Sequence, residues 1–224
     1  MPSLFLMRDV FHEQLDAVFD DLTAICGQVE VAVRRATEAL LSGDAAVAEQ
    51  VITDDAEIDQ ARERVEESAF QLLSLQQPVA GDLRVIIAAL RMVTELERMG
   101  DLSVHVAKIA RLRVPNVAVP EGINETMTKM AETAEDMVRR VGQIIRHRDV
   151  SAAIELGRDD EVMDQLRRHS FTQLLGDDWA HGVEAAVDVA LLGRYYERIA
   201  DHAVSIANRV VFVVTGEKPH RGEV

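Results

Sequence analysis

The sequence contains two copies of a Glu-Arg-x-x-Asp motif, 100 residues apart. The first copy is Glu97-Arg98-Met99-Gly100-Asp101 and the second is Glu197-Arg198-Ile199-Ala200-Asp201. If each copy lies in a helix, its glutamate and aspartate occupy positions i and i+4, so both carboxylates lie on one face, about one turn apart. Like charges at this spacing are slightly destabilising unless something neutralises them. The repeated motif therefore indicates a function for paired carboxylates.

A second acidic pair accompanies each motif. Asp55 and Asp59 precede the first motif, and Asp160 and Asp164 precede the second, again at positions i and i+4. Two neighbouring helices that each carry such a pair would bring four carboxylates together, and the pocket would repel itself unless a cation binds. Oxygen ligands favour Mg, Mn, Ca or Fe, as single ions or as a small cluster. The candidate metal ligands are therefore Asp55, Asp59, Glu97, Asp101, Asp160, Asp164, Glu197 and Asp201.

Simpler interpretations of these acids remain open. The acidic stripes can be the solvated faces of amphipathic helices, on which neighbouring arginines pair with the carboxylates. Asp54-Asp55 and Asp159-Asp160-Glu161 can be acids of a first helical turn, where they favour the helix dipole. His105 and His202 could add a nitrogen ligand, but they occupy different positions in the two halves of the sequence.

The sequence lacks the common signatures of catalysis. It contains no Gly-rich phosphate loop, no Gly-x-Ser-x-Gly and no His-Glu-x-x-His. Di-iron carboxylate bundles use a Glu-x-x-His motif on two helices, and the nearest match here, from Asp178 to His181, occurs once. We therefore expect a protein that is not an enzyme, with a di-metal carboxylate oxidase or hydrolase as the alternative.

Composition restricts the partners and the compartment. The chain has 224 residues and a net charge of −15, which disfavours nucleic acid and anionic lipid as partners. Cys26 is the only cysteine, so an internal disulfide is impossible and a reducing cytoplasm is expected. The first residues do not resemble a signal peptide, and no apolar stretch in the sequence is long enough to span a membrane.

The elements that position these acids are predicted to be helices. The chain has five prolines and twelve glycines, and aromatic residues make up 4% of it. Apolar residues recur every three or four positions through six long segments, as in amphipathic helices. Asp44 and Asp82 are predicted to cap the second and third helices. The expected helices cover approximately 11–41, 45–75, 83–112, 124–147, from the break at 148–149 to 175, and 182–214.

The two halves of the chain are an internal duplication. With an offset of 105 residues, Val33-Arg34-Arg35 aligns with Val138-Arg139-Arg140, and the offset becomes 100 at the Glu-Arg-x-x-Asp motifs. Such self-similarity indicates a repeated supersecondary unit. The predicted fold is all-α, with two tandem three-helix bundles of spectrin-like up-down helices related by a pseudo-twofold axis. We expect a first repeat over 8–113, a linker over 114–122, a second repeat over 123–216 and a loose tail over 217–224.

The chain resembles the PhoU family over essentially its whole length. The resemblance rests on the stretches Gln76-Gln77-Pro78-Val79-Ala80-Gly81-Asp82-Leu83-Arg84, Leu96-Glu97-Arg98-Met99-Gly100-Asp101 and Tyr196-Glu197-Arg198-Ile199-Ala200-Asp201-His202-Ala203. It implies a cytoplasmic adaptor that negatively regulates phosphate uptake and signalling. Such an adaptor links the ATPase subunit of the phosphate ABC transporter to the sensor histidine kinase of the phosphate two-component system.

The resemblance also implies an assembly and a cofactor. Some relatives form dimers, so a homodimer is expected, and it would associate with the membrane through its protein partners. Some carry divalent or trivalent metal ions on the acidic motifs, so Mg, Mn, Fe or Zn is expected at the eight candidate ligands.

Overall fold

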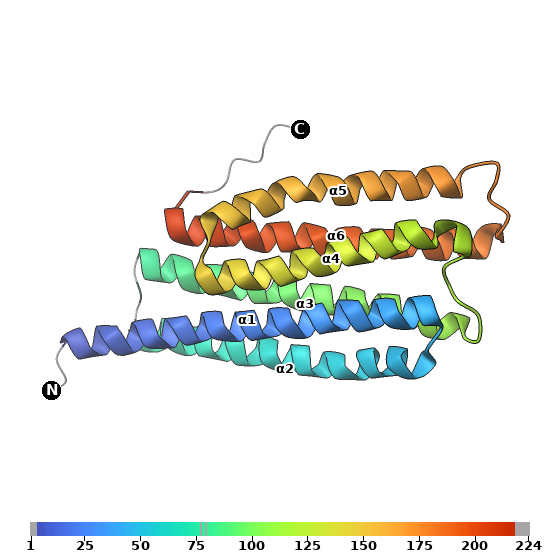
Figure 1. The fold of residues 1–224 in the computed structure, drawn as a ribbon. Helices are drawn as coiled ribbons and strands as arrows, with labels where there is room; N and C mark the ends of the chain where they lie inside the picture. The colour runs from blue at the N-terminus through green and yellow to red at the C-terminus, as the bar shows by residue number, and fades with distance from the viewer. Residues whose placement is uncertain (1–3, 77, 79, 218–224) are drawn as a thin grey trace.

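Six long helices make up the protein. The computed structural model describes residues 4–76, 78 and 80–217, and no β-strand occurs among them. The prediction of an all-α fold is confirmed, and Figure 1 shows the helices lying roughly alongside one another, each running back in the direction opposite to the one before it. The helices are α1 (Leu4–Ser42), α2 (Ala45–Gln76), α3 (Gly81–Arg113), α4 (Glu121–His147), α5 (Val150–Leu174) and α6 (Gly182–Thr215).

The tight connections follow the predicted turn chemistry. Gly43 follows α1 with a φ of 70°, a left-handed conformation that glycine adopts without strain. Asp44 then caps α2, because its Oδ1 accepts two backbone N–H groups of the first turn at 2.8 and 3.1 Å. Asp149 caps α5 similarly and accepts one backbone N–H at 3.0 Å.

Three predicted helix starts need correction. Asp82 does not cap α3, because the helix begins at Gly81, two residues before the predicted start, and the capping position is Ala80, which has no side-chain acceptor. Asp82 lies in the first turn instead, where its charge favours the helix dipole. Helix α1 begins at Leu4 instead of 11, and α4 begins at Glu121 instead of 124. Residues 77 and 79, in the predicted stop between α2 and α3, lie outside the described residues.

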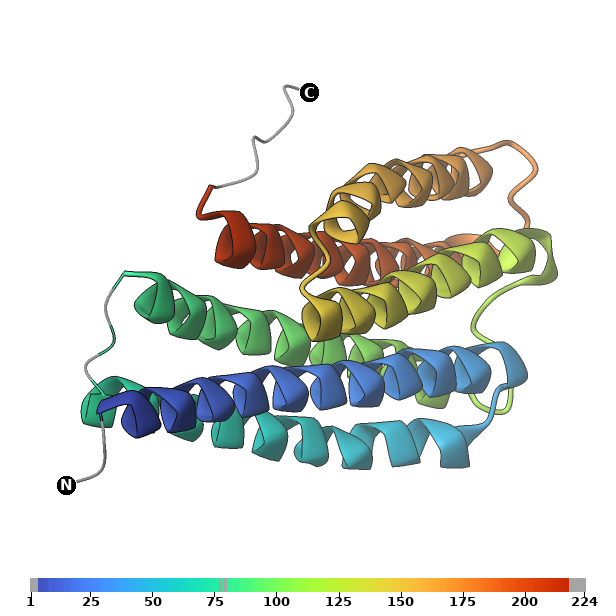
Figure 2. The ribbon, with the colours of Figure 1, turned by 60° about the vertical axis from the view of Figure 1, so that its left-hand side comes forward.

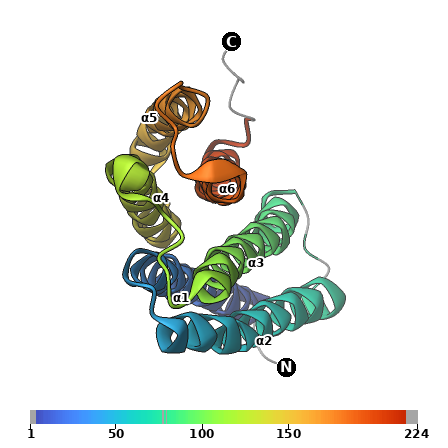
Figure 3. The same cartoon turned by 90° about the vertical axis from the view of Figure 1, so that its right-hand side faces the viewer.

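The two repeats pack through equivalent helices. Figure 3, which looks along the helices, shows α1, α2 and α3 in one group and α4, α5 and α6 in another. Helix α1 packs against α4, and α3 packs against α6. Figure 2 shows α4 lying alongside α1. Each of these helices therefore meets its own counterpart, as an approximate twofold relation between the repeats requires, and α2 and α5 lie on the outside.

One hydrophobic core extends through both repeats. Leu22 and Met130, from α1 and α4, are fully buried within it. Gly142 lets these two helices approach closely, because a Cβ added to it would lie 3.2 Å from the Cβ of Cys26. Burial raises the pKa of the Cys26 thiol, so the thiolate form is disfavoured.

The described chain ends just beyond α6. Gly216 ends this helix in a left-handed conformation with a φ of 79°. The expected loose tail over 217–224 lies outside the described residues except for Glu217. The predicted repeat and linker boundaries stay predictions. Within the described residues, no helix combines the length and the apolar character that crossing a membrane requires.

Candidate metal centres

The first candidate centre lies between α2 and α3. The pKa of Asp55 is raised from 3.8 to about 6, first by burial and then by the negative charges of Asp101, Asp59 and Glu97. The pKa of Glu97 is also raised, by burial and then by the charge of Asp101. These charges act across the contact between α2 and α3. The four predicted residues of the first repeat therefore share one electrostatic neighbourhood.

The second candidate centre repeats this arrangement between α5 and α6. The pKa of Asp160 is raised from 3.8 to about 6 by burial and by the charges of Asp201, Asp164 and Glu197, in that order. Burial and the charge of Glu197 also raise the pKa of Asp201. Asp160 thus has the same three acidic neighbours as its counterpart Asp55 in the first repeat.

The acids of α2 and α5 do not belong to a first helical turn. Helix α2 begins at Ala45 and α5 begins at Val150, so Asp55 and Asp160 lie more than two turns inside their helices. The helix dipole acts mainly within the terminal turn. The interpretation of these residues as dipole-stabilising acids is therefore wrong.

Close packing shapes the first centre. A Cβ added to Gly100 would lie 3.0 Å from Oδ1 of Asp55 and 3.1 Å from Cδ1 of Ile58. Glycine at this position of the motif therefore allows the Asp55 carboxylate to lie against the backbone of α3. The second motif has Ala200 at this position, and its methyl group is fully buried.

Arginine side chains distinguish the two centres. In the second repeat, Glu197 accepts hydrogen bonds from Arg167 Nη1 at 2.5 Å and from Arg194. In the first repeat, the counterpart of Arg167 is Arg62, which bonds instead to the two carboxylate oxygens of Glu66 at 2.9 and 3.0 Å. The second centre therefore already contains partial neutralisation by guanidinium groups.

Two residue differences explain this contrast. Phe171 replaces Glu66 in the second repeat, so Arg167 packs over a phenyl ring, 5.5 Å from its centroid, and has no carboxylate there to bind. Arg194 has Thr94 as its counterpart in the first repeat. Within the described part of the chain, Glu97 accepts no arginine hydrogen bond like those of Glu197, although the charges of Arg62 and Arg98 act on it from nearby. The two centres therefore differ in direct hydrogen bonding to the motif glutamate.

The donor set suits a hard cation, although the ligands are not yet assembled. Each centre offers only carboxylate oxygens, and a bound cation would relieve the repulsion that raises their pKa values. Among the described residues, no three acidic, histidine or cysteine side chains lie close enough to hold an ion as they stand. Binding therefore requires side-chain rotation, for which the exposed Asp59 and Asp101 have room. Metal binding by the eight acids stays a prediction.

The two histidines near the motifs take part in the interface between the repeats. His105 stacks on Tyr195, with the ring centroids 5.3 Å apart. His202 Nδ1 lies 2.7 Å from Glu95 Oε2, and both side chains are almost fully buried. These contacts give both histidines a role in packing α3 against α6.

Sequence reasoning missed the buried polar cluster around Glu95. Besides contacting His202, Oε1 of Glu95 accepts hydrogen bonds from Arg209 Nη2 at 3.0 Å and from Ser205 Oγ at 3.3 Å. The bond to His202, followed by the bond to Arg209, lowers the pKa of Glu95 from 4.5 to about 2. The one available signal was a carboxylate at an apolar position of the α3 helix, two residues before the motif.

Comparison with known proteins identifies the family. The PhoU domain model matches residues 22–110 and 127–210. A Mycobacterium tuberculosis protein named phosphate-specific transport system accessory protein PhoU homolog 2 is 48% identical over 213 residues, covering 95% of this chain and 100% of the relative. Homolog 1 of the same organism is 43% identical over 218 residues, covering 97% and 99%.

Solved structures agree with these sequence matches. The crystal structure of PhoU from Pseudomonas aeruginosa superposes with a TM-score of 0.84 at 29% identity, covering 92% of this chain and 100% of that one. The PhoU structure from Streptococcus pneumoniae gives a TM-score of 0.84 at 26% identity, with coverages of 93% and 98%. With two matched domains, relatives that align from end to end and the same six-helix fold, this chain belongs to the PhoU family.

Proposed function

We propose that this protein is a cytoplasmic regulator of phosphate uptake and signalling. The observation that carries the proposal is the end-to-end match to relatives named as accessory proteins of phosphate-specific transport. The protein would link the ATPase subunit of the phosphate ABC transporter to the sensor histidine kinase and keep the starvation response off when phosphate is plentiful. It would act as a homodimer, reach the membrane through these partners and catalyse no reaction.

The two carboxylate centres would serve this role by binding cations. Asp55, Asp59, Glu97 and Asp101 would hold an ion in the first repeat, and their four counterparts would do so in the second. A bound divalent or trivalent ion supplies positive charge that neutralises the acids and connects the middle helix of each repeat to the third. The first centre should bind more tightly, because a cation there need not displace hydrogen bonds like those that Arg167 and Arg194 donate to Glu197.

Calorimetric titration with Mn²⁺ and Mg²⁺ tests the cation sites. Asp101→Ala combined with Asp201→Ala should lower the affinity at least tenfold while the helical circular dichroism is retained. Asp101→Ala alone should remove the tighter phase. A matched control, Glu57→Ala with Glu155→Ala, removes two exposed carboxylates from α2 and α5 and should leave binding unchanged. Equal metal affinity of the wild type and the variant with Asp101→Ala and Asp201→Ala would refute the ligand assignment.

Capture from membranes tests the regulatory role. The immobilised full chain should retain the transporter ATPase subunit and the sensor kinase from detergent extracts of phosphate-replete cells. An unrelated acidic helical protein of similar charge serves as the control. Recovery of neither partner would contradict the proposal. Oxygen consumption or ester hydrolysis by the metal-loaded protein would instead support the di-metal enzyme alternative.

A further inference from the structure

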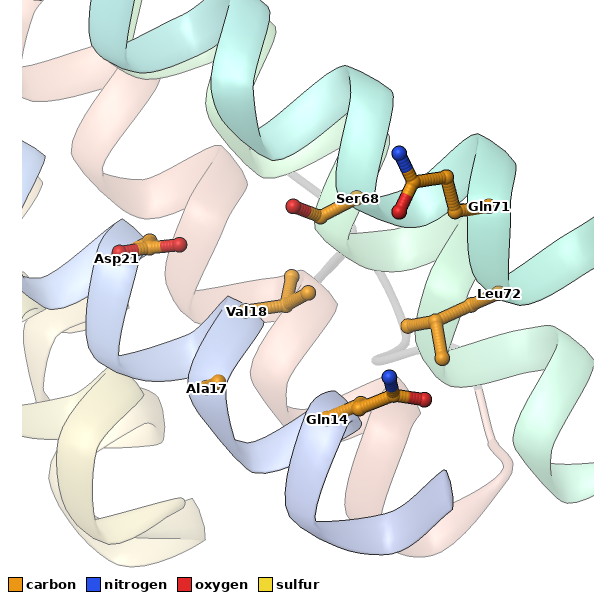
Figure 4. A pocket seen from close by; sticks show the side chains of 7 residues that line it. All are labelled: Gln14, Ala17, Val18, Asp21, Ser68, Gln71 and Leu72. Carbon is orange, nitrogen blue, oxygen red and sulfur yellow. The ribbon is translucent and has the colours of Figure 1, made fainter. Parts of the chain in front are cut away.

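The outer surface of the first repeat contains two hollows that follow each other between α1 and α2. The smaller one, of about 160 Å³, is shown in Figure 4, where Gln14, Val18 and Asp21 of α1 lie opposite Ser68 and Leu72 of α2. The larger one, of about 360 Å³, begins at Ala24, one turn further along α1. We call this larger hollow the α1–α2 groove.

The α1–α2 groove combines apolar side chains with a one-sided carboxylate wall. Val31 of α1 is 40% exposed in it. Gly27 leaves it open, since a Cβ added there would meet no atom within 4 Å. Helix α2 contributes the exposed carboxylates of Asp54 and Glu57. The groove therefore offers apolar contact beside negative charge.

A hollow of similar size occurs at the same place in the second repeat. It has about 340 Å³ and lies between α4 and α5. Its lining residues Glu132, Thr133, Asp136, Met137, Arg140 and Val162 correspond, with the offset of 105, to Gly27, Gln28, Val31, Ala32, Arg35 and Glu57.

The chemistry of the two hollows differs although the positions agree. In the second repeat, glutamate and aspartate replace Gly27 and Val31, and Val162 replaces Glu57. The three-helix architecture thus produces the hollow in both repeats. The apolar α1 side and the Glu57 carboxylate are features of the first repeat alone, whereas Asp54 and Asp55 have aspartates as counterparts in the second repeat. The open apolar side beside Glu57 therefore needs an explanation specific to the first repeat.

The walls of the α1–α2 groove select the kind of occupant. Both walls are helices whose backbone groups are already paired, so an added β-strand would find no backbone partner. An amphipathic helix satisfies its own backbone and can place apolar side chains in such a groove. The α1 wall from Ala24 to Arg35 is about 17 Å long, enough for about three turns of helix.

The charges of the α1–α2 groove and one buried hydrogen-bond acceptor indicate the charge of the occupant. Asp54, Asp55 and Glu57 line the α1–α2 groove, and its one basic residue, Arg35, pairs with Asp54 at 3.2 Å. Asp55 and Glu57 are left as the carboxylates that an occupant can meet. Oε1 of Gln28, which also lines the groove, is buried and has no hydrogen-bond donor within the described part of the chain. A positively charged occupant matches the carboxylates, and its lysine or arginine N–H groups can donate to Oε1 of Gln28 once that side chain rotates towards the groove. A second copy of this chain matches poorly, because its net charge is −15.

We infer that the α1–α2 groove binds a cationic amphipathic helix of a partner protein. The apolar side chains of the helix lie against Val31 and above Gly27, and its lysine or arginine side chains pair with Glu57. This inference requires no metal and names no partner protein. Its failure would therefore leave the proposed regulatory function standing.

A designed peptide of 18 residues, with leucines on one helical face and lysines elsewhere, provides the binding probe. Fluorescence anisotropy with the full chain should show saturable binding, and the same peptide with glutamates in place of lysines should bind at least tenfold more weakly. Gly27→Leu fills the groove and should weaken binding at least tenfold. Gly157→Leu is the matched control, because it places the same side chain at another open helical position, and it should bind as the wild type does.

Charge reversal separates groove binding from general attraction to an acidic protein. Glu57→Lys should weaken peptide binding at least fivefold, whereas Glu132→Lys, which makes the same charge change in the hollow of the second repeat, should have little effect. Equal losses in the two variants would overturn the inference, as would wild-type affinity in Gly27→Leu. A change in the oligomeric state of Gly27→Leu, with peptide binding unchanged, would show that a second copy occupies the groove.

Discussion

Neutralising one carboxylate in each centre should stabilise the metal-free protein. Asp55→Asn combined with Asp160→Asn removes the two groups whose pKa values are raised to about 6. A raised carboxylate pKa means that the folded chain binds the proton more tightly than the unfolded chain. The stability that these groups contribute is therefore fully present below about pH 4 and is lost as the pH rises through 6.

The size of the effect follows from the pKa values. A rise from 3.8 to about 6 corresponds to at most about 3 kcal/mol for each carboxylate. Both side chains are only half-buried, so solvent screening reduces this to about 1 kcal/mol each. The double variant should then gain about 2 kcal/mol at pH 7, which raises the Tm of a chain of this length by about 4–8 °C.

Thermal and urea unfolding in the presence of a chelator measures this gain. The wild type should become more stable between pH 7 and pH 5, and the double variant should lack most of this pH dependence. Saturating Mn²⁺ should reduce the pH dependence of the wild type, because the cation replaces the protons. Glu57→Gln with Glu155→Gln provides the control, since both are exposed acids on the same two helices. A double variant that is less stable than the wild type at pH 7 would refute the reasoning.

Three further substitutions test the packing of the repeats by urea unfolding. Glu95→Ala should destabilise the folded protein by about 3 kcal/mol, because its arginine and histidine partners stay buried and unpaired. The pKa of Glu95 is lowered to about 2, so the stability that this carboxylate contributes is present above pH 4.5 and declines as the pH falls towards 2. Gly142→Ala should cost about 1 kcal/mol, because its methyl group would lie 3.2 Å from the Cβ of Cys26, whereas Gly157→Ala at an open position should gain about 0.5–1 kcal/mol. Tyr196→Phe should cost about 1 kcal/mol, because it removes a buried 2.9 Å hydrogen bond to a threonine hydroxyl of α1. Unchanged urea midpoints would contradict each of these contacts.

Local signals predicted the fold because the helices obey local rules. Apolar periodicity identified all six helices, and the short side chain of Asp44 capped α2 as its type and position suggested. The duplication then implied that equivalent acids share equivalent surroundings. Asp55 and Asp160 confirm this, since each has its pKa raised by the corresponding three acids of its own repeat.

Contacts between the repeats could not be predicted in this way. Glu95 and its partners on α6 are more than 100 residues apart, and only the packing of α3 against α6 brings them together. The packing of these two helices also brings Arg113 to the buried Asp188, to which it donates two hydrogen bonds at 2.5 and 3.1 Å. Among the residues that the structure describes, the equivalent positions in the other repeat do not form such polar contacts, so the duplication does not indicate either of these two clusters. The predicted cap of α3 was wrong for a different reason, because Ala80, which has no side-chain acceptor, occupies the capping position.

The differences between the repeats suggest that the two ligands of the first repeat influence each other. Asp55 belongs to the first centre and also lines the α1–α2 groove. A cation at the centre reduces the negative charge that a cationic helix meets, so each ligand should lower the affinity of the protein for the other by the same factor. The second repeat has a valine in place of Glu57 and acids in place of Gly27 and Val31, and Arg167 and Arg194 lie near its carboxylates, so this coupling should be confined to the first. Peptide binding should therefore be weaker in Mg²⁺ than in NaCl of equal ionic strength. Asp101→Ala should remove this difference between the two salts, whereas Asp201→Ala should preserve it.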